Sequence, residues 1–184
     1  MPSMIGQPVR RTEDLRLLTG SGCFADDVNV SGQVYAVMVR SPHAHARIRS
    51  IDGKLALAAG ALAVLTGADC REDGLGHVPN NPLVSSPPDI RIDNRDGSEI
   101  FLAKQQVLPE DKVRYVGEAV AMVVTETLEQ AKDAAELVMV DYEPLKPVCD
   151  TVAAATADAP VVWDELGGNV CIDGDVGDLP GTEA

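Results

Sequence analysis

The 184-residue chain is short, acidic and poor in aromatic residues, which narrows the functions that it can carry. Its length suffices for one globular domain with its own hydrophobic core. The net charge of −14 argues against binding nucleic acid, whose phosphates it would repel, and against docking onto anionic lipid. Because only 3% of the side chains are aromatic, stacking surfaces for bases or sugars are scarce.

Residues 1–33 have no regular apolar period, and we expect them to form an N-terminal arm with turns. The arm combines basic and large apolar side chains, namely Arg10, Arg11, Arg16, Leu15, Leu17, Leu18 and Phe24. We expect this arm to contact parts of a larger assembly, with the alternative that its apolar residues fold back onto the same chain. It lacks the apolar segment of a signal peptide.

Apolar runs predict one α/β domain over residues 34–160. Val34–Val39 and Ala119–Val124 are continuous apolar runs that predict buried strands. Further strands are expected at 47–51, 61–66, 113–116 and 138–142, with short helices at 52–59, capped by Asp52 and ended by Gly60, and at 151–157. We expect a mixed sheet with two or three covering helices and a long, mobile loop at 70–100.

A capping box opens the best-defined helix. The Thr127 hydroxyl can accept from the backbone N–H three residues later, and Gln130 can reach back. Leu128, Ala131, Ala135 and Val138 are expected to share the stripe that packs on the sheet. If the strands on either side of this helix are parallel in one sheet, the crossover should be right-handed.

Histidines give the first candidate site, a metal centre. His43 and His45 alternate along the chain and could point the same way, but no third ligand is near and His77 lies in the loop. The alternative is one partly buried and one exposed histidine. The four cysteines are widely spaced, without the paired ligands of iron–sulfur or zinc sites, and are expected to be reduced thiols.

Other motifs are weaker still. Glu118, beside a glycine and a buried strand, could be a general base with a raised pKa, or it could cap a turn. Gly20-Ser-Gly22 lacks the third glycine of a dinucleotide site, and Asp173–Asp178 lacks the terminal Glu of a calcium loop. We therefore assign no catalytic, cofactor-binding or metal-binding residue to this chain, and the residues alone indicate a scaffold or interaction domain.

A series of motifs in the same order nevertheless resembles a known family, the molybdenum hydroxylases. The motifs are Arg11-Thr-Glu-Asp-Leu-Arg16, Phe24-Ala-Asp-Asp27, Ser41-Pro-His-Ala-His-Ala-Arg-Ile48, Leu65-Thr-Gly-Ala-Asp69, Lys112-Val-Arg-Tyr-Val-Gly-Glu-Ala-Val-Ala121 and Val140-Asp-Tyr-Glu-Pro-Leu145. They resemble the start of the large subunit in aldehyde oxidases, xanthine dehydrogenases and aerobic carbon monoxide dehydrogenases. The resemblance implies an α/β hammerhead fold and a non-catalytic structural role.

The resemblance also implies what the rest of the enzyme supplies. The molybdenum–molybdopterin cofactor and the glutamate base belong to later parts of the large subunit, and iron–sulfur clusters and FAD to partner domains or subunits. The parent enzyme would hydroxylate aldehydes or N-heterocycles, or oxidise carbon monoxide, as a dimer of heterotrimers. The resemblance also implies a location in the cytoplasm, with export to the periplasm directed by a partner as the alternative. Residues 161–184 are expected to be a linker towards the missing cofactor domain. The chain would be a split subunit or a fragment; a free-standing binding or adaptor module is the alternative.

Overall fold

The computed structural model describes residues 6, 8–79, 94–174 and 181–182, and the chain divides into two compact units, Met1–Gln33 and Val34–Ala184. The first unit contains α1 (Asp14–Leu18) and a 3-10 turn, η1 (Ala25–Asp27). In each, a carboxylate accepts from a backbone N–H three residues earlier, Asp14 from Arg11 and Asp27 from Phe24. These local bonds explain why two short helical turns interrupt an arm that has no apolar period.

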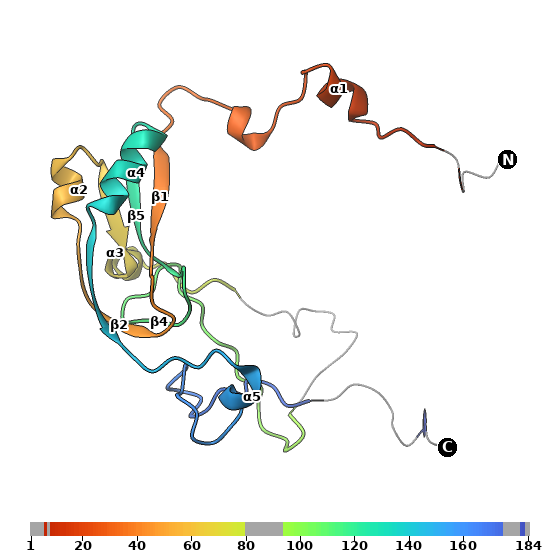
Figure 1. The fold of residues 1–184 in the computed structure, drawn as a ribbon, viewed down its shortest axis with the longest axis vertical. Helices are drawn as coiled ribbons and strands as arrows, with labels where there is room; N and C mark the ends of the chain where they lie inside the picture. Colours follow the sequence, from red (N-terminus) through yellow and green to blue (C-terminus); the bar gives the residue numbers. More distant parts are fainter. Residues whose placement is uncertain (1–5, 7, 80–93, 175–180, 183–184) are drawn as a thin grey trace. The chain divides into compact units, whose positions relative to one another are not determined.

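The second unit is built on two antiparallel sheets of three strands each (Figure 1). The first sheet has the order β1-β5-β3, with β1 at Tyr35–Arg40, β5 at Ala119–Thr125 and β3 at Ala63–Thr66. The second has the order β4-β2-β6, with β4 at Lys112–Val113, β2 at Ala46–Asp52 and β6 at Met139–Pro144. The expected α/β class is confirmed, and most strands lie within a few residues of their predicted positions.

The arrangement of the strands differs from the prediction. We expected one mixed sheet, whereas all four strand pairings within these two sheets are antiparallel. The strands that flank the longest helix, β5 and β6, lie in different sheets, so the right-handed crossover does not arise. An apolar period indicates that a segment is a strand but does not say which strand is its neighbour, which explains the error.

In the described part of this unit, four helices accompany the sheets: α2 (Lys54–Ala58), α3 (Gly67–Glu72), α4 (Leu128–Glu136) and α5 (Thr151–Ala154). The predicted cap of α4 is present, since Thr127 Oγ1 accepts from the Gln130 N–H at 3.2 Å. Asp52 accepts from the Lys54 N–H at the start of α2, also as expected. We did not predict α3, which begins where the Asp69 carboxylate accepts from both the N–H and the hydroxyl of Thr66.

Small apolar residues form the core between α4, α2 and the sheets. One cluster contains Ala56, Val123, Ala134 and Val138, and a second contains Ala46, Val113 and Val120. The predicted stripe of α4 is confirmed at Ala131 and Val138, which are buried, and wrong at Leu128, which is 38% exposed; Ala134, which was not predicted, is also buried. The stripe centres on alanines because small side chains let the helix backbone approach the sheet closely.

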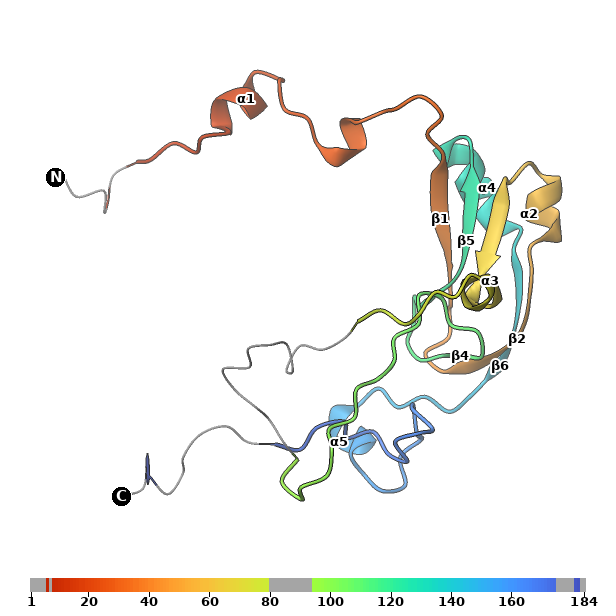
Figure 2. The ribbon, with the colours of Figure 1, turned by 180° about the vertical axis from the view of Figure 1, so that it is seen from behind.

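Residues 150–174 are folded, although we expected residues 161–184 to be a linker. The Asn169 side chain ties together the backbone of this segment: its oxygen accepts from the Val162 N–H, and its nitrogen donates to the carbonyls of Ala154 and Pro160. The segment also bonds to residues 94–101, through the pairs Asp173–Asn94 and Phe101–Cys171. Figure 2 shows this segment below the sheets, around α5. Residues 80–93 of the predicted mobile loop lie outside the described residues.

Candidate functional site

An ion pair and a cation–π contact lie at the short strand β4 and directly after it. Lys112, although only 2% exposed, places its Nζ 2.8 Å from Asp164 Oδ2. Two residues further on, the Arg114 guanidinium lies over the Trp163 ring, 4.1 Å from its centroid. Lys112 on β4 and Arg114 directly after it thus contact the adjacent residues Asp164 and Trp163. An ammonium buried in this way must be paired, which the Asp164 carboxylate accomplishes.

Electrostatics around Asp164 follow from this geometry. The hydrogen bond from Lys112 holds the pKa of the Asp164 carboxyl below its usual value, and the charges of Lys112, Arg47 and Arg114 act in the same direction. Asp164 is therefore ionised at neutral pH and matches the buried ammonium. A carboxylate committed to one cation in this way is a structural anchor and a poor proton acceptor.

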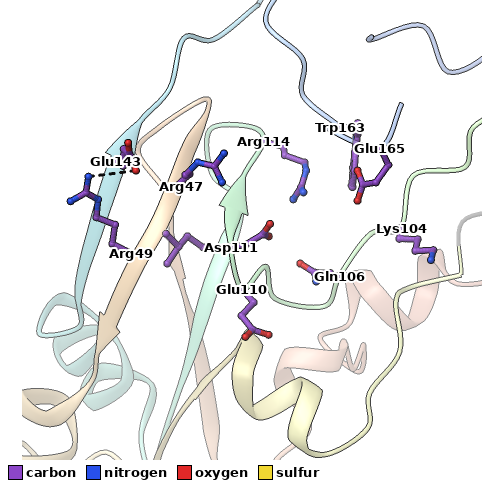
Figure 3. A pocket seen from close by; sticks show the side chains of 11 residues that line it. Arg47, Arg49, Lys104, Gln106, Glu110, Asp111, Arg114, Glu143, Trp163 and Glu165 are labelled. Atoms are coloured by element: carbon purple, nitrogen blue, oxygen red, sulfur yellow. Dashed lines mark ion pairs between the residues drawn. The ribbon is translucent and has the colours of Figure 1, made fainter. Parts of the chain in front are cut away.

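An open pocket of about 560 Å³ lies beside β4 and β2 (Figure 3). Its lining includes four basic side chains and four acidic ones, Arg47, Arg49, Lys104, Arg114, Glu110, Asp111, Glu143 and Glu165. Several are already paired: Arg49 with Glu143 at 3.5 Å, and Glu110 with Arg71 at 2.6 Å. Because the lining carries equal numbers of basic and acidic side chains, the pocket has no excess of either charge that would gather an anion or a cation.

Glu118 closes the turn between β4 and β5. Its Oε2 accepts from the Arg114 N–H at 2.6 Å, which is the turn-capping alternative raised from the sequence. Burial raises the pKa of the Glu118 carboxyl, and the bond from Arg114 opposes that shift. The raised pKa is the one expected of a general base, but the short bond to backbone holds the carboxylate in the turn.

The two histidines do not converge. His45 is buried, with Nδ1 3.0 Å from the Lys146 carbonyl, whereas the His43 ring packs edge-on against Tyr142 at 5.0 Å between centroids. The alternation that would aim both rings at one ion requires a strand, and residues 41–45 form an irregular turn. His43 is half-buried, so the alternative of one exposed histidine is also wrong.

Tyr142, whose ring contacts His43, lies on β6 and is half-buried. Loss of hydration raises the pKa of its hydroxyl, with a smaller opposing effect from the Ser41 hydroxyl. A phenol with a raised pKa stays neutral at physiological pH. Together with His43, Tyr142 therefore packs the turn that leads from β1 into β2.

The remaining candidates stay apart. Cys23, Cys70, Cys149 and Cys171 are all free thiols. Among the described residues, no three His, Cys, Asp or Glu side chains are grouped so that they could hold a metal ion. His77 is exposed, Gly20 and Gly22 lie in the first unit, and the Asp-rich loop from Asp173 falls mostly outside the described residues. No helix in the described ranges is long and apolar enough to cross a membrane.

Trp163, Asp164 and Asn169 were missed from the sequence. They lie in a Gly- and Asp-rich stretch that we interpreted as a linker. One signal could have found them: Trp163 is the only tryptophan of the chain, and a single large aromatic residue in a polar segment often anchors it. The partner on β4 could not have been found, because the pairing spans 52 residues of sequence.

Comparison with known proteins adds independent evidence. The family model described as "Aldehyde oxidase and xanthine dehydrogenase, a/b hammerhead domain" matches residues 19–86 and 82–146. The chain is 38% identical over 158 residues to the carbon monoxide dehydrogenase large chain of Afipia carboxidovorans, which covers 85% of this chain and 17% of that protein. It is also 38% identical over 173 residues to the nicotine 6-hydroxylase large subunit of Paenarthrobacter nicotinovorans, covering 94% and 19%.

Solved structures agree with these matches. Quinoline 2-oxidoreductase from Pseudomonas putida 86 superposes with a TM-score of 0.73 at 37% identity, covering 90% of this chain and 19% of that one. A Cu,Mo-CO dehydrogenase superposes with a TM-score of 0.68 at 39% identity, covering 84% and 17%. The chain therefore spans less than a fifth of the length of these similar proteins. The predicted hammerhead fold is confirmed.

Proposed function

The chain belongs to the aldehyde oxidase and xanthine dehydrogenase family, in which it matches the α/β hammerhead domain of the large subunit, and from this premise we propose that it is a structural domain without catalytic residues. The observation that carries the proposal is that the polar side chains around β4 are bound to other residues of the same domain. Lys112 is bound to Asp164, Arg114 lies on Trp163, and Glu118 caps the β4–β5 turn. These three side chains therefore support a structural role.

In this proposal the molybdenum–molybdopterin cofactor is held by the rest of the large subunit. The described residues do not fit it. The four basic side chains that line the open pocket are matched by four carboxylates, two of them on the adjacent residues Glu110 and Asp111, so the pocket has no excess positive charge to hold the phosphate of a pterin cofactor. The described residues also bring no set of three ligating side chains together. No step of the reaction is therefore assigned to this chain.

The parent enzyme, by the same proposal, oxidatively hydroxylates an aldehyde or an N-heterocycle, or oxidises carbon monoxide. Its electrons leave through iron–sulfur clusters and FAD on partner subunits. The partners are the remainder of the large subunit, an iron–sulfur subunit and a flavin subunit, arranged as a dimer of heterotrimers. We place this assembly in the cytoplasm. Residues 1–33 would be its N-terminal arm, 34–160 the hammerhead domain, and the residues from 161 onward the connection to the cofactor domain.

Co-expression tests this function. The tagged chain is expressed together with the polypeptide carrying the rest of the large subunit and with the iron–sulfur and flavin subunits. We expect a stable complex that reduces an artificial electron acceptor with one of the three substrate classes. A chain that purifies alone, while the other polypeptides form an active enzyme without it, would instead indicate a free-standing adaptor module.

A further inference from the structure

The first sheet, β1-β5-β3, is apolar on both of its faces. On one face the register aligns Val37 with Val123 and Val64, and this face packs against the core with α2 and α4. On the other face two rows of three residues cross the sheet, namely Ala36–Val124–Ala63 and Met38–Met122–Leu65. We call these six residues the open face; none of them carries a polar side chain.

The open face is only partly shielded by the described residues. Ala36 is exposed and Met38 is 40% exposed, while the other four side chains are half-buried. Figure 2 views the three strands in front of α4, and no helix of residues 34–79 or 94–174 crosses the middle of the strands on that side. An antiparallel sheet with one face in water normally alternates apolar and polar residues. These strands do not alternate, which is why the sequence predicted them as buried.

A mismatch between pattern and exposure of this kind points to a surface that is covered in the intact protein. The strands are spaced at about 4.8 Å, and same-face residues at about 7 Å along each strand, so the open face covers roughly 200 Å². A stable complex between separate proteins buries about 800 Å² on each partner. The open face is therefore too small to hold a second copy of this chain by itself, but it suits a segment that other contacts or a peptide bond already hold in place.

We propose that the open face of β1-β5-β3 is where the remainder of the large subunit packs, by an apolar segment laid across Met38 and Met122. This inference rests on the proposed function. We choose the remainder of the large subunit as the binding partner because similar proteins have more than four-fifths of their chain outside the matched region. The small side chains Ala36 and Ala63 at the two edges let the backbone of such a segment approach closely.

Oxidation footprinting of the unmodified protein tests the proposal, because methionine oxidation follows exposure. The chain, alone and in complex with the rest of the large subunit, is treated with dilute hydrogen peroxide, and sulfoxide formation is followed by mass spectrometry. Met139, 63% exposed on β6, is the internal control. We expect Met38 to react at a rate similar to that of Met139 in the isolated chain and at least tenfold more slowly in the complex. Protection of Met38 in the isolated chain, or full reactivity in the complex, overturns the proposal.

A matched pair of variants separates this inference from the proposed function. Met38→Lys places a charge on the open face, and Met139→Lys makes the same change at an exposed methionine elsewhere. We expect the melting temperatures of both isolated chains to stay near that of the parent, and only Met38→Lys to weaken association, by at least tenfold. If both variants associate equally well, the open face is not the binding surface, although the proposed function can still hold. If even the parent chain fails to associate, the proposed function itself fails. If the isolated chain forms a dimer and Met38→Lys dissociates it, the open face instead binds a second copy of this chain.

Discussion

Lys112 and Asp164 form an ion pair, 2.8 Å from Nζ to Oδ2, that joins the short strand β4 to a segment 52 residues later in the chain. The lysine is almost fully buried, whereas the carboxylate is 66% exposed. The pair therefore differs from a surface salt bridge, because the ammonium has lost most of its hydration and depends on this one carboxylate.

Asp164→Asn should lower stability at neutral pH by about 1–2 kcal/mol, a value reduced from that of a fully buried pair because water reaches Asp164. Its pKa in the folded protein is depressed below 3.8, so the contribution of the pair is present above that pH and is lost as the pH falls through the folded value. Urea unfolding at pH 7 and at pH 3 measures the difference between parent and variant. A difference of equal size at both pH values would show that the charge of Asp164 is not responsible.

Lys112→Met is the matched control for that pair. It replaces a buried cation with an apolar side chain of similar length, which is often nearly neutral. We expect it to cost less than Asp164→Asn, because Asp164 can return to water whereas Lys112 cannot. Equal losses from both variants would contradict the asymmetry of the pair.

Asn169→Asp should loosen the segment around Trp163. The Asn169 nitrogen donates to two carbonyls, and a carboxylate oxygen in its place would face them without a proton. We expect a cost of about 1–3 kcal/mol. Fluorescence of Trp163, the single tryptophan, reports the local change, and circular dichroism reports the rest of the fold. Gln130→Glu makes the same chemical change on the exposed side of α4 and should leave the fluorescence unaltered.

The cap and the buried side of α4 give a further test. Thr127→Ala removes the acceptor for the Gln130 N–H and should cost about 1 kcal/mol. Ala131→Arg forces a charge into a fully buried position and should cost roughly 2–4 kcal/mol. Urea midpoints measure both, with Ala58→Arg on the exposed side of α2 as the control. A midpoint for Ala131→Arg equal to that of the parent would show that α4 does not pack through this residue.

The sequence predicts the segments of this fold better than their assembly. The strand at Val34–Val39 and the cap at Thr127 are determined by residues that are close in the sequence, so the local pattern predicts them. Helix α3 was also within reach, since Thr66 and Asp69 have the spacing of a capping pair. The two sheets, and the attachment of Trp163 and Asp164 to β4, depend on pairings between distant segments that no local period encodes. His43 and His45 could have met at one ion only on an extended strand, whereas residues 41–45 form a turn.

The arm at residues 8–30 should gain protection on assembly. Leu15, Leu18 and Phe24 are 75%, 86% and 67% exposed, and such a set is costly to leave in water. We expect backbone amides in the arm to exchange rapidly in the isolated chain and to become protected in the complex, as hydrogen exchange with mass spectrometry would show. Strong protection in the isolated chain would mean that the arm belongs to the local core and needs no partner.

The distribution of molybdenum between the isolated chain and its complex tests the central claim most directly. The metal is measured by inductively coupled plasma mass spectrometry after native purification of each. We predict no molybdenum, iron or flavin in the isolated chain, and about one molybdenum per copy of this chain in the complex with the rest of the large subunit. Stoichiometric molybdenum in the isolated chain would contradict the account, because the domain would then hold the cofactor that we assign to the remainder of the enzyme.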